Sequence, residues 1–360
     1  MTIKLTFGMI VLNGEPFLRY NLRSLYPFAH QIIVVEGACP SAAAVATADG
    51  HSTDGTLEVL KDFKHSEDPE NKIFIVTACD EGFTDGFWPG KNEMSQAYAK
   101  RATGNYLWQV DSDEFYHEIQ MSRLITLLER ERPDAVSFPM ITFWGGLNYV
   151  ANGFYLIRDA PEYHRLFSWK AGYTYKSHFP PKVYDERGVD LKKKNWLRAK
   201  KLEKEGIFFY HYSLLFPLQV YNKVKYYKER NKSQIASWEE SVYRRLEKPF
   251  RVHNVYWSIS WLERFCGDHP SQVLAMMNDV NNGTIVIEKR DCADVERLLS
   301  RSMYVHATVV LRMVARISFY QPFKFIRRAY SSFIYRSSRL WKAIWTNPTS
   351  TSTVVKEHFD

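Results

Sequence analysis

Residues 106–114 have the sequence YLWQVDSDE, an apolar run followed directly by an acidic cluster. Side chains alternate along a strand, so Asp111 and Asp113 would point the same way if the strand continues past Val110. Two converging carboxylates are unfavourable unless a cation lies between them. Mg²⁺ and Mn²⁺ are the usual cations, and they often bridge to phosphate oxygens. The stretch therefore indicates an enzyme with a phosphorylated or nucleotide-linked substrate, although an isolated Asp-x-Asp pair more often marks a solvated turn.

Strand and helix patterns alternate around this stretch. Apolar or β-branched runs predict strands at residues 5–12, 31–35, 73–77, 106–110, 135–143 and 207–212. Apolar residues at helical spacing predict helices at residues 15–28, 57–63, 91–101 and 121–132, the second capped by Ser52 or Thr53. This order predicts an α/β fold with a mainly parallel sheet flanked by helices. Ligands of such sheets bind beyond the carboxyl ends of the strands, where Asn13, Glu36, Asp111 and Asp113 would lie.

The composition favours a well-packed protein with free thiols. The chain has 360 residues, 45% of them hydrophobic and 15% aromatic, enough for a domain of about 200–250 residues with an appendage. Its four cysteines lack paired spacing, which argues against a disulfide framework or a zinc site. The first residues do not resemble a signal peptide, and no apolar run approaches the ~20 residues of a transmembrane helix. We therefore expect a cytoplasmic protein.

The basic character of the chain is concentrated near its C-terminal end. The net charge is +8, and residues 297–345 contain ten Lys and Arg but no Asp or Glu. From residue 303 onward, apolar and basic residues mix as they do in interfacial amphipathic helices. Residues 303–345 therefore predict contact with an anionic membrane surface; the alternative is helices packed on the body with a solvated basic face. We expect no nucleic-acid binding, because no recognised module is present.

Four segments together resemble a family 2 glycosyltransferase of the GT-A fold. They are VLNGEPFLRYNLRSL (11–25), VVEG (34–37) with DGHSTDGT (49–56), GKNEMSQAYAKRATGNYLWQVDSDEF (90–115) and YHYSLLFPLQVYNKVKYY (210–227). The second segment is similar to the family's VDDGSTDGT, split by an Ala-rich insertion. The resemblance covers about residues 3–230 and leaves the middle loops unmatched. We accordingly expect a GT-A catalytic domain at 1–215, a helical region at 216–300, basic amphipathic helices at 301–345 and a flexible tail at 346–360.

The resemblance implies roles for individual side chains. The residues that would bind the nucleotide-sugar are Asn13, Glu36, Asp54, Lys91, Asn92 and Asp111. Asp111, Asp113 and His211 would hold Mn²⁺ or Mg²⁺ on the donor diphosphate. Several of these residues also have a structural explanation. Glu36 would be an acid in a turn, and Asp54 an acid at a helix N-terminus. Lys91 and Asn92 would form a solvated helix start, and His211 would be a hydrogen-bonded core residue.

The catalytic base has no clear candidate in the sequence. Inverting members of the family use an Asp or Glu, often in a Glu-Asp pair, and residues 140–215 contain no such pair. The acids available there are Asp159, Glu162 and Asp185, with His164 and His178 as further options. Four aromatic residues in this region would form an acceptor platform or pack in the core: Phe143, Trp144, Tyr149 and Trp169.

The expected function is metal-dependent transfer of a sugar from a nucleotide-sugar donor to a hydroxyl of a glycan or glycolipid acceptor. Surface polysaccharide, lipopolysaccharide or glycolipid biosynthesis would use such a reaction. A sugar-nucleotide pyrophosphorylase is a poorer match, because the loop after the first strand, Asn13 to Pro16, lacks the Gly-rich, basic sequence of that class. A non-catalytic, membrane-associated assembly or binding protein on a degenerate transferase fold remains the alternative.

Overall fold

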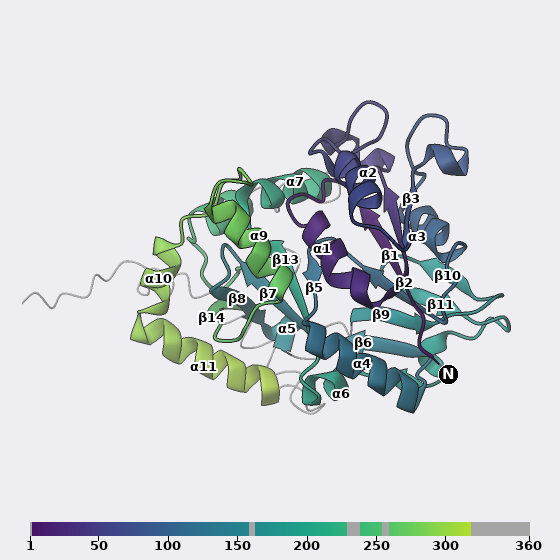
Figure 1. The fold of residues 1–360 in the computed structure, drawn as a ribbon. Coiled ribbons are helices and arrows are strands. Elements are labelled where there is room, and N and C mark those ends of the chain that lie inside the picture. The colour runs from purple at the N-terminus through teal and green to yellow at the C-terminus, as the bar shows by residue number, and fades with distance from the viewer. Residues whose placement is uncertain (1, 158–162, 229–237, 254–258, 318–360) are drawn as a thin grey trace, which may run out of the picture.

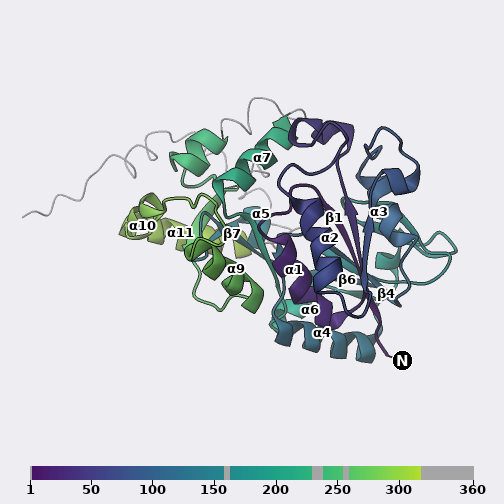
Figure 2. The ribbon, with the colours of Figure 1, turned by 45° about the horizontal axis from the view of Figure 1, so that its top comes forward.

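The structure is a computed structural model that describes residues 2–157, 163–228, 238–253 and 259–317 (Figures 1 and 2). Its largest element is a seven-stranded sheet with the strand order β12-β6-β9-β4-β1-β2-β3. The strands are β1 (Leu5–Val11), β2 (Ala29–Glu36), β3 (Ile73–Val76), β4 (Tyr106–Val110), β6 (Ala135–Phe138), β9 (Tyr163–Ser168) and β12 (Trp196–Leu197). β9 runs antiparallel to both of its neighbours, and the other strands are parallel to one another. The predicted mainly parallel α/β sheet is confirmed.

Helices cover both faces of this sheet. One face packs against α1 (Leu18–Leu25), α2 (Thr56–Ser66) and α4 (Glu118–Glu131). The other packs against α3 (Lys91–Ala99) and the hairpin of β10 (Thr174–Ser177) and β11 (Lys182–Tyr184). The approach of α3 is close, because a Cβ on Gly8 of β1 would lie 2.5 Å from the Tyr98 ring. α2 begins at Thr56 after Gly55, so the expected Ser52 or Thr53 cap is wrong.

A second, five-stranded sheet has the order β14-β8-β7-β13-β5. Its strands are β5 (Glu114–Phe115), β7 (Met140–Trp144), β8 (Tyr149–Gly153), β13 (Phe209–Leu214) and β14 (Ser260–Arg264). The single strand expected at 135–143 is in fact two strands in different sheets. They separate at Pro139, which has no backbone N–H to donate to a neighbouring strand and whose carbonyl oxygen accepts from the Phe209 N–H at 3.0 Å.

Helices dominate the rest of the described chain. The α-helices are α5 (Phe154–Ile157), α6 (Ala199–Lys204), α7 (Pro217–Lys228), α9 (Ser271–Asn281), α10 (Ala293–Leu299) and α11 (Ser302–Ile317). A π-helix, η5, spans Glu239–Arg244, and 3₁₀ turns occupy η1 (Tyr26–Phe28), η2 (Pro40–Val45), η3 (Cys79–Glu81) and η4 (Leu191–Lys193). The region 216–300 is thus not wholly helical, because β14 lies within it. Within the described residues, no helix is both long and apolar enough to span a bilayer. The remainder of 301–345 and the tail expected at 346–360 lie outside them.

Candidate functional site

The acidic cluster lies where the two sheets meet. β4 ends at Val110, and the chain turns at once, since the Glu114 N–H donates to the Asp111 carbonyl at 3.1 Å. β5 then pairs antiparallel with β13, which places Glu114 opposite His211. Figure 1 shows β5 beside β13, with α7 beyond them. The extended conformation therefore does not continue past Val110, and Asp111 and Asp113 acquire different partners.

Asp113 and His211 face each other across this junction. The Asp113 Oδ1 lies 3.5 Å from His211 Nε2, and Gln219 of α7 donates to Asp113 Oδ2 at 3.2 Å. Burial raises the pKa of Asp113, but the neighbouring His211 and Lys223 outweigh burial and hold it below its usual value. The two side chains keep 20% and 19% of their surface exposed. Asp113 is therefore an ionised carboxylate, positioned by α7, that a ligand can reach.

This pair fits two ligands of one divalent cation. Adjacent ligands of a cation with ~2.1 Å bonds lie about 3 Å apart, close to the 3.5 Å between Asp113 Oδ1 and His211 Nε2. Mg²⁺ commonly takes one or two protein ligands and fills its remaining positions with phosphate and water. In the part of the chain that the structure describes, no group of three or more His, Cys, Asp or Glu forms a metal cluster. The predicted trio of Asp111, Asp113 and His211 is therefore not assembled as a set.

Asp111 turns towards Arg165 instead. Arg165 Nη2 donates to Asp111 Oδ2 at 3.2 Å and also to Glu114 Oε1. Glu114 is fully buried; burial raises its pKa, while the charge of the paired Arg165 opposes this and favours the ionised carboxylate. Arg165 is itself buried, with its guanidinium 5.7 Å from the Phe209 ring centroid. Neither Arg165 nor Glu114 was predicted; the available signal was an Arg directly before the apolar pair Leu166-Phe167, because a buried Arg is normally paired.

Glu36, Asn13 and Asp54 were expected to contact the nucleotide, but each forms hydrogen bonds within the protein instead. Glu36 is fully buried, and its oxygens accept from the Ser52 N–H at 2.8 Å and contact His51 Nδ1 at 2.7 Å. Asn13 donates to the Val45 carbonyl at 2.7 Å and accepts from the Thr53 N–H at 2.7 Å.

Asp54 accepts from the Glu15 and Thr56 N–H groups at 3.0 and 3.1 Å. It is thus the helix N-terminal acid that the sequence allowed as an alternative. Together these three side chains fasten the Ala-rich insertion and the start of α2 to the ends of β1 and β2, and Glu36 has no exposed oxygen for a nucleotide.

Lys91 and Asn92 lie at the start of α3, beside the β10–β11 hairpin. Asn92 Oδ1 accepts from the His178 N–H at 2.9 Å, and the Lys91 ammonium lies 4.7 Å from the Tyr226 ring centroid of α7. Burial, aided by the positive charges of Lys91 and Arg165, lowers the pKa of His178 to about 4 although Asp111 opposes this. Lys91, Arg165 and Asp111 thus all lie close enough to His178 to shift its pKa.

Lys223 and Gln219 of α7 are site residues that the sequence analysis did not assign. Lys223 is half-buried and near enough to Asp113 to lower its pKa. It also helps burial to lower the pKa of His253 to about 3. The signal was present in the quoted segment 210–227, where Lys223 begins its Lys-x-x-x-Tyr pattern.

The residues considered for the catalytic base lie in different surroundings. Asp159 and Glu162 lie outside the described residues. Asp185 organises a turn: it accepts from the Arg187 and Val189 N–H groups at 3.0 and 2.8 Å and from Lys194 at 3.1 Å. These bonds hold its pKa below the usual value. His164 alternates with Arg165 along β9 and bonds to Ser137 at 2.7 Å, so it faces away from Asp111.

The aromatic residues expected to form an acceptor platform mostly pack in the core. Phe143 is buried and stacks on Tyr212 with ring centroids 4.4 Å apart. Trp144 is buried and donates to the Val252 carbonyl at 3.1 Å, and Tyr149 is buried against Glu296. Only Trp169 of the four is partly exposed.

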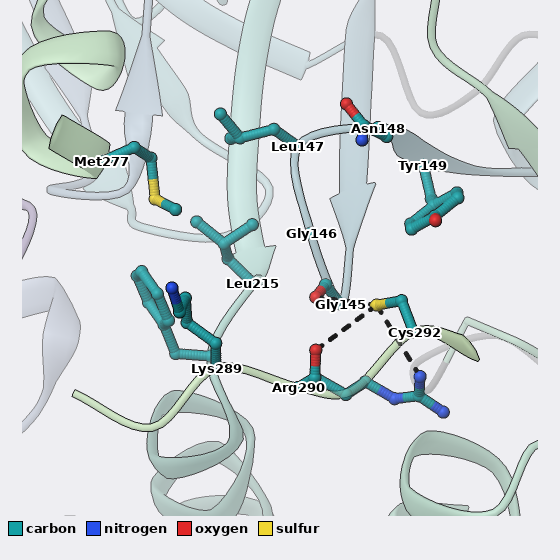
Figure 3. A pocket seen from close by; sticks show the side chains of 11 residues that line it. Gly145, Gly146, Leu147, Asn148, Tyr149, Leu215, Met277, Lys289, Arg290 and Cys292 are labelled. Atoms are coloured by element: carbon teal, nitrogen blue, oxygen red, sulfur yellow. Dashed lines mark hydrogen bonds between the residues drawn. The ribbon is translucent and has the colours of Figure 1, made fainter. Parts of the chain in front are cut away.

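A pocket of about 200 Å³ lies beyond the carboxyl ends of β7 and β13 (Figure 3). Leu147, Leu215 and Met277 point towards one another across it. Lys289 stands at its edge, whereas the Arg290 guanidinium points away and pairs with Asp294 at 2.6 Å. Leu215 also leads into α7, because its N–H donates to the side chain of Gln219 at 3.2 Å. Gln219 therefore contacts both Leu215, which lines the pocket, and Asp113 of the Asp113–His211 pair.

Residues 6–153 match the model of the family described as glycosyl transferase family 2. Residues 6–153 are therefore similar to a family 2 glycosyltransferase domain. The match contains β1 to β4 and the acidic cluster, and it ends with β8. The mainly parallel sheet with helices on both faces is the architecture expected for the GT-A fold of this family. A search of curated proteins finds no match.

Solved glycosyltransferase structures align with the chain at low similarity. S. aureus TarS 1–349 in complex with UDP is 14% identical over 67% of this chain and 73% of that chain, with a TM-score of 0.35. S. aureus TarS is 15% identical over 46% and 28%, with a TM-score of 0.30. M. tuberculosis glucosyl-3-phosphoglycerate synthase, in complex with Mn²⁺, UDP and glucosyl-3-phosphoglycerate, is 18% identical over 39% and 44%, with a TM-score of 0.27. The aligned part of this chain therefore spans between 28% and 73% of these chains, and at such TM-scores they say nothing of its substrate.

Proposed function

We propose that the chain transfers a sugar from a nucleotide-sugar donor to an acceptor hydroxyl, with Mn²⁺ or Mg²⁺ on the donor diphosphate. The observation that carries this proposal is the Asp113–His211 pair, 3.5 Å apart, at the junction of the two sheets of a family 2 domain. Asp111 would contact the donor from the other side of the same turn. Lys91 and Asn92 are proposed on the nucleotide side, because His178, which Asn92 bonds, is near enough to both Lys91 and Asp111 for their charges to shift its pKa.

The chemistry of transfer sets what these residues must do. A divalent cation, when bound, neutralises the charge that develops on the nucleoside diphosphate as the glycosidic bond breaks. Asp113 stays ionised at neutral pH, and Gln219 fixes the direction of its second oxygen. Lys223 adds a positive charge on the same side, suited to a phosphate. Arg165 holds Asp111 in one orientation, which fixes the position of the donor against the acceptor.

A donor screen by thermal denaturation tests this proposal. UDP-, GDP-, dTDP- and CMP-sugars are each added with Mn²⁺ or with EDTA to the wild type and to Asp113→Ala. Because a ligand stabilises the state that binds it, donor at ~100 times its dissociation constant should add about 2.7 kcal/mol to the free energy of unfolding. We expect stabilisation by one nucleotide class, lost with EDTA and in the variant. A folded wild type that no donor stabilises would favour the non-catalytic binding protein instead.

The acceptor is proposed to be a glycan or glycolipid of surface polysaccharide or lipopolysaccharide biosynthesis. The support is the basic, acid-free composition of residues 297–345, which suits a protein on the cytoplasmic face of an anionic membrane. Such a location brings the site to lipid-linked acceptors. The protein would then be a peripheral membrane protein.

The pocket beyond β7 and β13 is proposed to receive part of the acceptor. It opens beside the segment that supports Gln219 and Asp113, and its lining is mostly apolar with Lys289 at the edge. Met277→Trp should fill it and raise the KM for acceptor about tenfold, without changing donor hydrolysis in the absence of acceptor. Leu274→Trp, on the exposed side of the same helix, is the matched control and should change neither. An unchanged acceptor KM in Met277→Trp would exclude the pocket.

A further inference from the structure

The helix α11 presents a large apolar surface to solvent. Its inner side is buried through Tyr304, Leu311 and Ala315. Its outer side exposes Met303, Val305, Val309, Val310 and Met313, each with 43–57% of its surface accessible. With about 100° of rotation per residue, these five side chains fall within an arc of about 160°, the outer arc. Ser302 and His306 are exposed in the same arc, so it is mainly rather than wholly apolar. A solvated surface helix normally carries mostly polar side chains in such an arc, so this one calls for a partner.

The orientation of the outer arc is fixed by the inner side of the helix. The Leu262 N–H of β14 donates to the Tyr304 hydroxyl at 2.9 Å, and Arg312 forms an ion pair with Glu263 of the same strand. α11 therefore cannot roll to bury the outer arc without breaking contacts with the second sheet. Figure 1 shows α10 and α11 at the outside of the molecule, at the end away from β10 and β11. The outer arc is thus held outward at one end of the fold.

Charge decides between the possible partners. Residues 302–317 contain no Asp or Glu, and residues 318–345, which follow them in the sequence, contain six Lys and Arg and again no acid. A second copy of this end of the chain would bring like charges together. An anionic lipid surface instead attracts these cations while its acyl boundary accepts the apolar side chains.

We propose that the outer arc of α11 is the face that docks on an anionic membrane, with its apolar side chains entering the headgroup–acyl boundary. This deepens the proposed function and rests on it for the lipid-linked nature of the acceptor. The family 2 domain then lies above the membrane with α11 between it and the lipid. Because this end of the chain is basic and free of acids in sequence, binding should depend on anionic lipid and weaken with salt.

Co-sedimentation of the full chain with lipid vesicles tests the docking face. The vesicles contain phosphatidylcholine alone or mixed with phosphatidylglycerol, at low and high salt. The test variant is Val309→Ser with Met313→Ser, and the matched control is Leu274→Ser with Val286→Ser, which removes two exposed apolar side chains elsewhere. Wild type and control should bind the anionic vesicles and be released by salt, and the test variant should bind about tenfold more weakly.

Three results would overturn the inference. They are equal binding of the test variant and the wild type, absence of wild-type binding to anionic vesicles, and a wild-type dimer that the test variant converts to a monomer. Release of nucleoside diphosphate from the donor is measured on the same samples, without vesicles. Vesicle binding without any nucleotide release would contradict the proposed function but support the docking face. Nucleotide release without vesicle binding would support the proposed function but contradict the docking face.

Discussion

Arg165 is the side chain on which the acidic cluster depends most. It is buried, and it pairs with the buried Glu114 while contacting Asp111. Removing one partner of a buried ion pair leaves an uncompensated charge, which costs about 3–5 kcal/mol. We therefore expect Arg165→Met to lower the free energy of unfolding by about that amount, and Arg165→Met with Glu114→Gln to recover part of it. Urea denaturation of both variants measures this, and equal losses in the two would contradict the ion pair.

Glu15 gives the fold a pH dependence of its own. Burial, together with the nearby Asp54, raises the pKa of Glu15 to about 7, with Arg19 opposing. The folded protein therefore holds this proton more tightly than the unfolded chain, whose carboxyl has a pKa near 4.5. The folded state loses stability as the pH rises from about 4.5 to 7, by about 1–3 kcal/mol from this group.

Replacing the ionisable group tests this sign. Glu15→Gln should raise the melting temperature relative to wild type at pH 8 and leave it unchanged near pH 4.5. Thermal denaturation across this range is the measurement. A variant that is less stable than wild type at pH 8 would show that the ionised carboxylate is favourable where it stands.

Some site residues could be predicted from the sequence, and others could not, because their partners come from distant loops. Asp113 and His211 belong to segments that the family resemblance aligned, and the structure brings them together. Glu36 was assigned to the nucleotide because nothing in the sequence shows that His51 and Ser52, from the second half of the split motif, would cover it. Which partner a carboxylate finds is decided by how loops return to the sheet, and spacing along the chain does not report that.

At the scale of elements, the loop around Gly50 lies very close to the loop around Gly86. Gly50 has a φ of +80°, and a Cβ there would lie 2.2 Å from the Gly86 carbonyl oxygen. Gly188, with a φ of +76°, has no atom within 4 Å of such a Cβ. Both substitutions by Ala carry the cost of positive φ, about 1–2 kcal/mol.

Only Gly50→Ala adds a collision, so it should destabilise the fold by about 1–3 kcal/mol more than Gly188→Ala. The difference between the two variants in urea denaturation isolates the close approach of the two loops. Equal destabilisation would mean that the loop around Gly50 can move away from residue 86 without cost. It would then be a loosely attached loop.

Elements with strong local patterns were predictable, and those defined by distant pairing were not. The strand predicted at 106–110 coincides with β4, because a short β-branched or apolar run flanked by polar residues has few alternatives. The division of 135–143 into β6 and β7 depends on two different neighbours, β9 and β13. β14 lies in a region whose pattern is otherwise helical, and it forms because β8 offers a free edge.

For the whole molecule, the two proposed functional surfaces lie in different places. The proposed donor site lies at the junction of the two sheets, and the proposed docking face, the outer arc of α11, lies at the end of the fold that continues into the basic segment. The pocket near Met277 lies on the second sheet, whose far strand β14 holds α11. An acceptor anchored in a membrane would thus approach from the side of the second sheet, and a soluble nucleotide-sugar from the side of the large one.

The most direct test of the account measures release of nucleoside diphosphate from the nucleotide-sugar that the thermal screen selects. Wild type should release it with Mn²⁺ or Mg²⁺ and not with EDTA. Asp113→Asn should lose about 100-fold or more in rate, and Asp185→Asn, whose carboxylate only organises a turn, should stay within about twofold of wild type. Release that persists unchanged with EDTA and in Asp113→Asn would contradict the metal site. Absence of release from every donor by folded wild type would contradict the transferase itself.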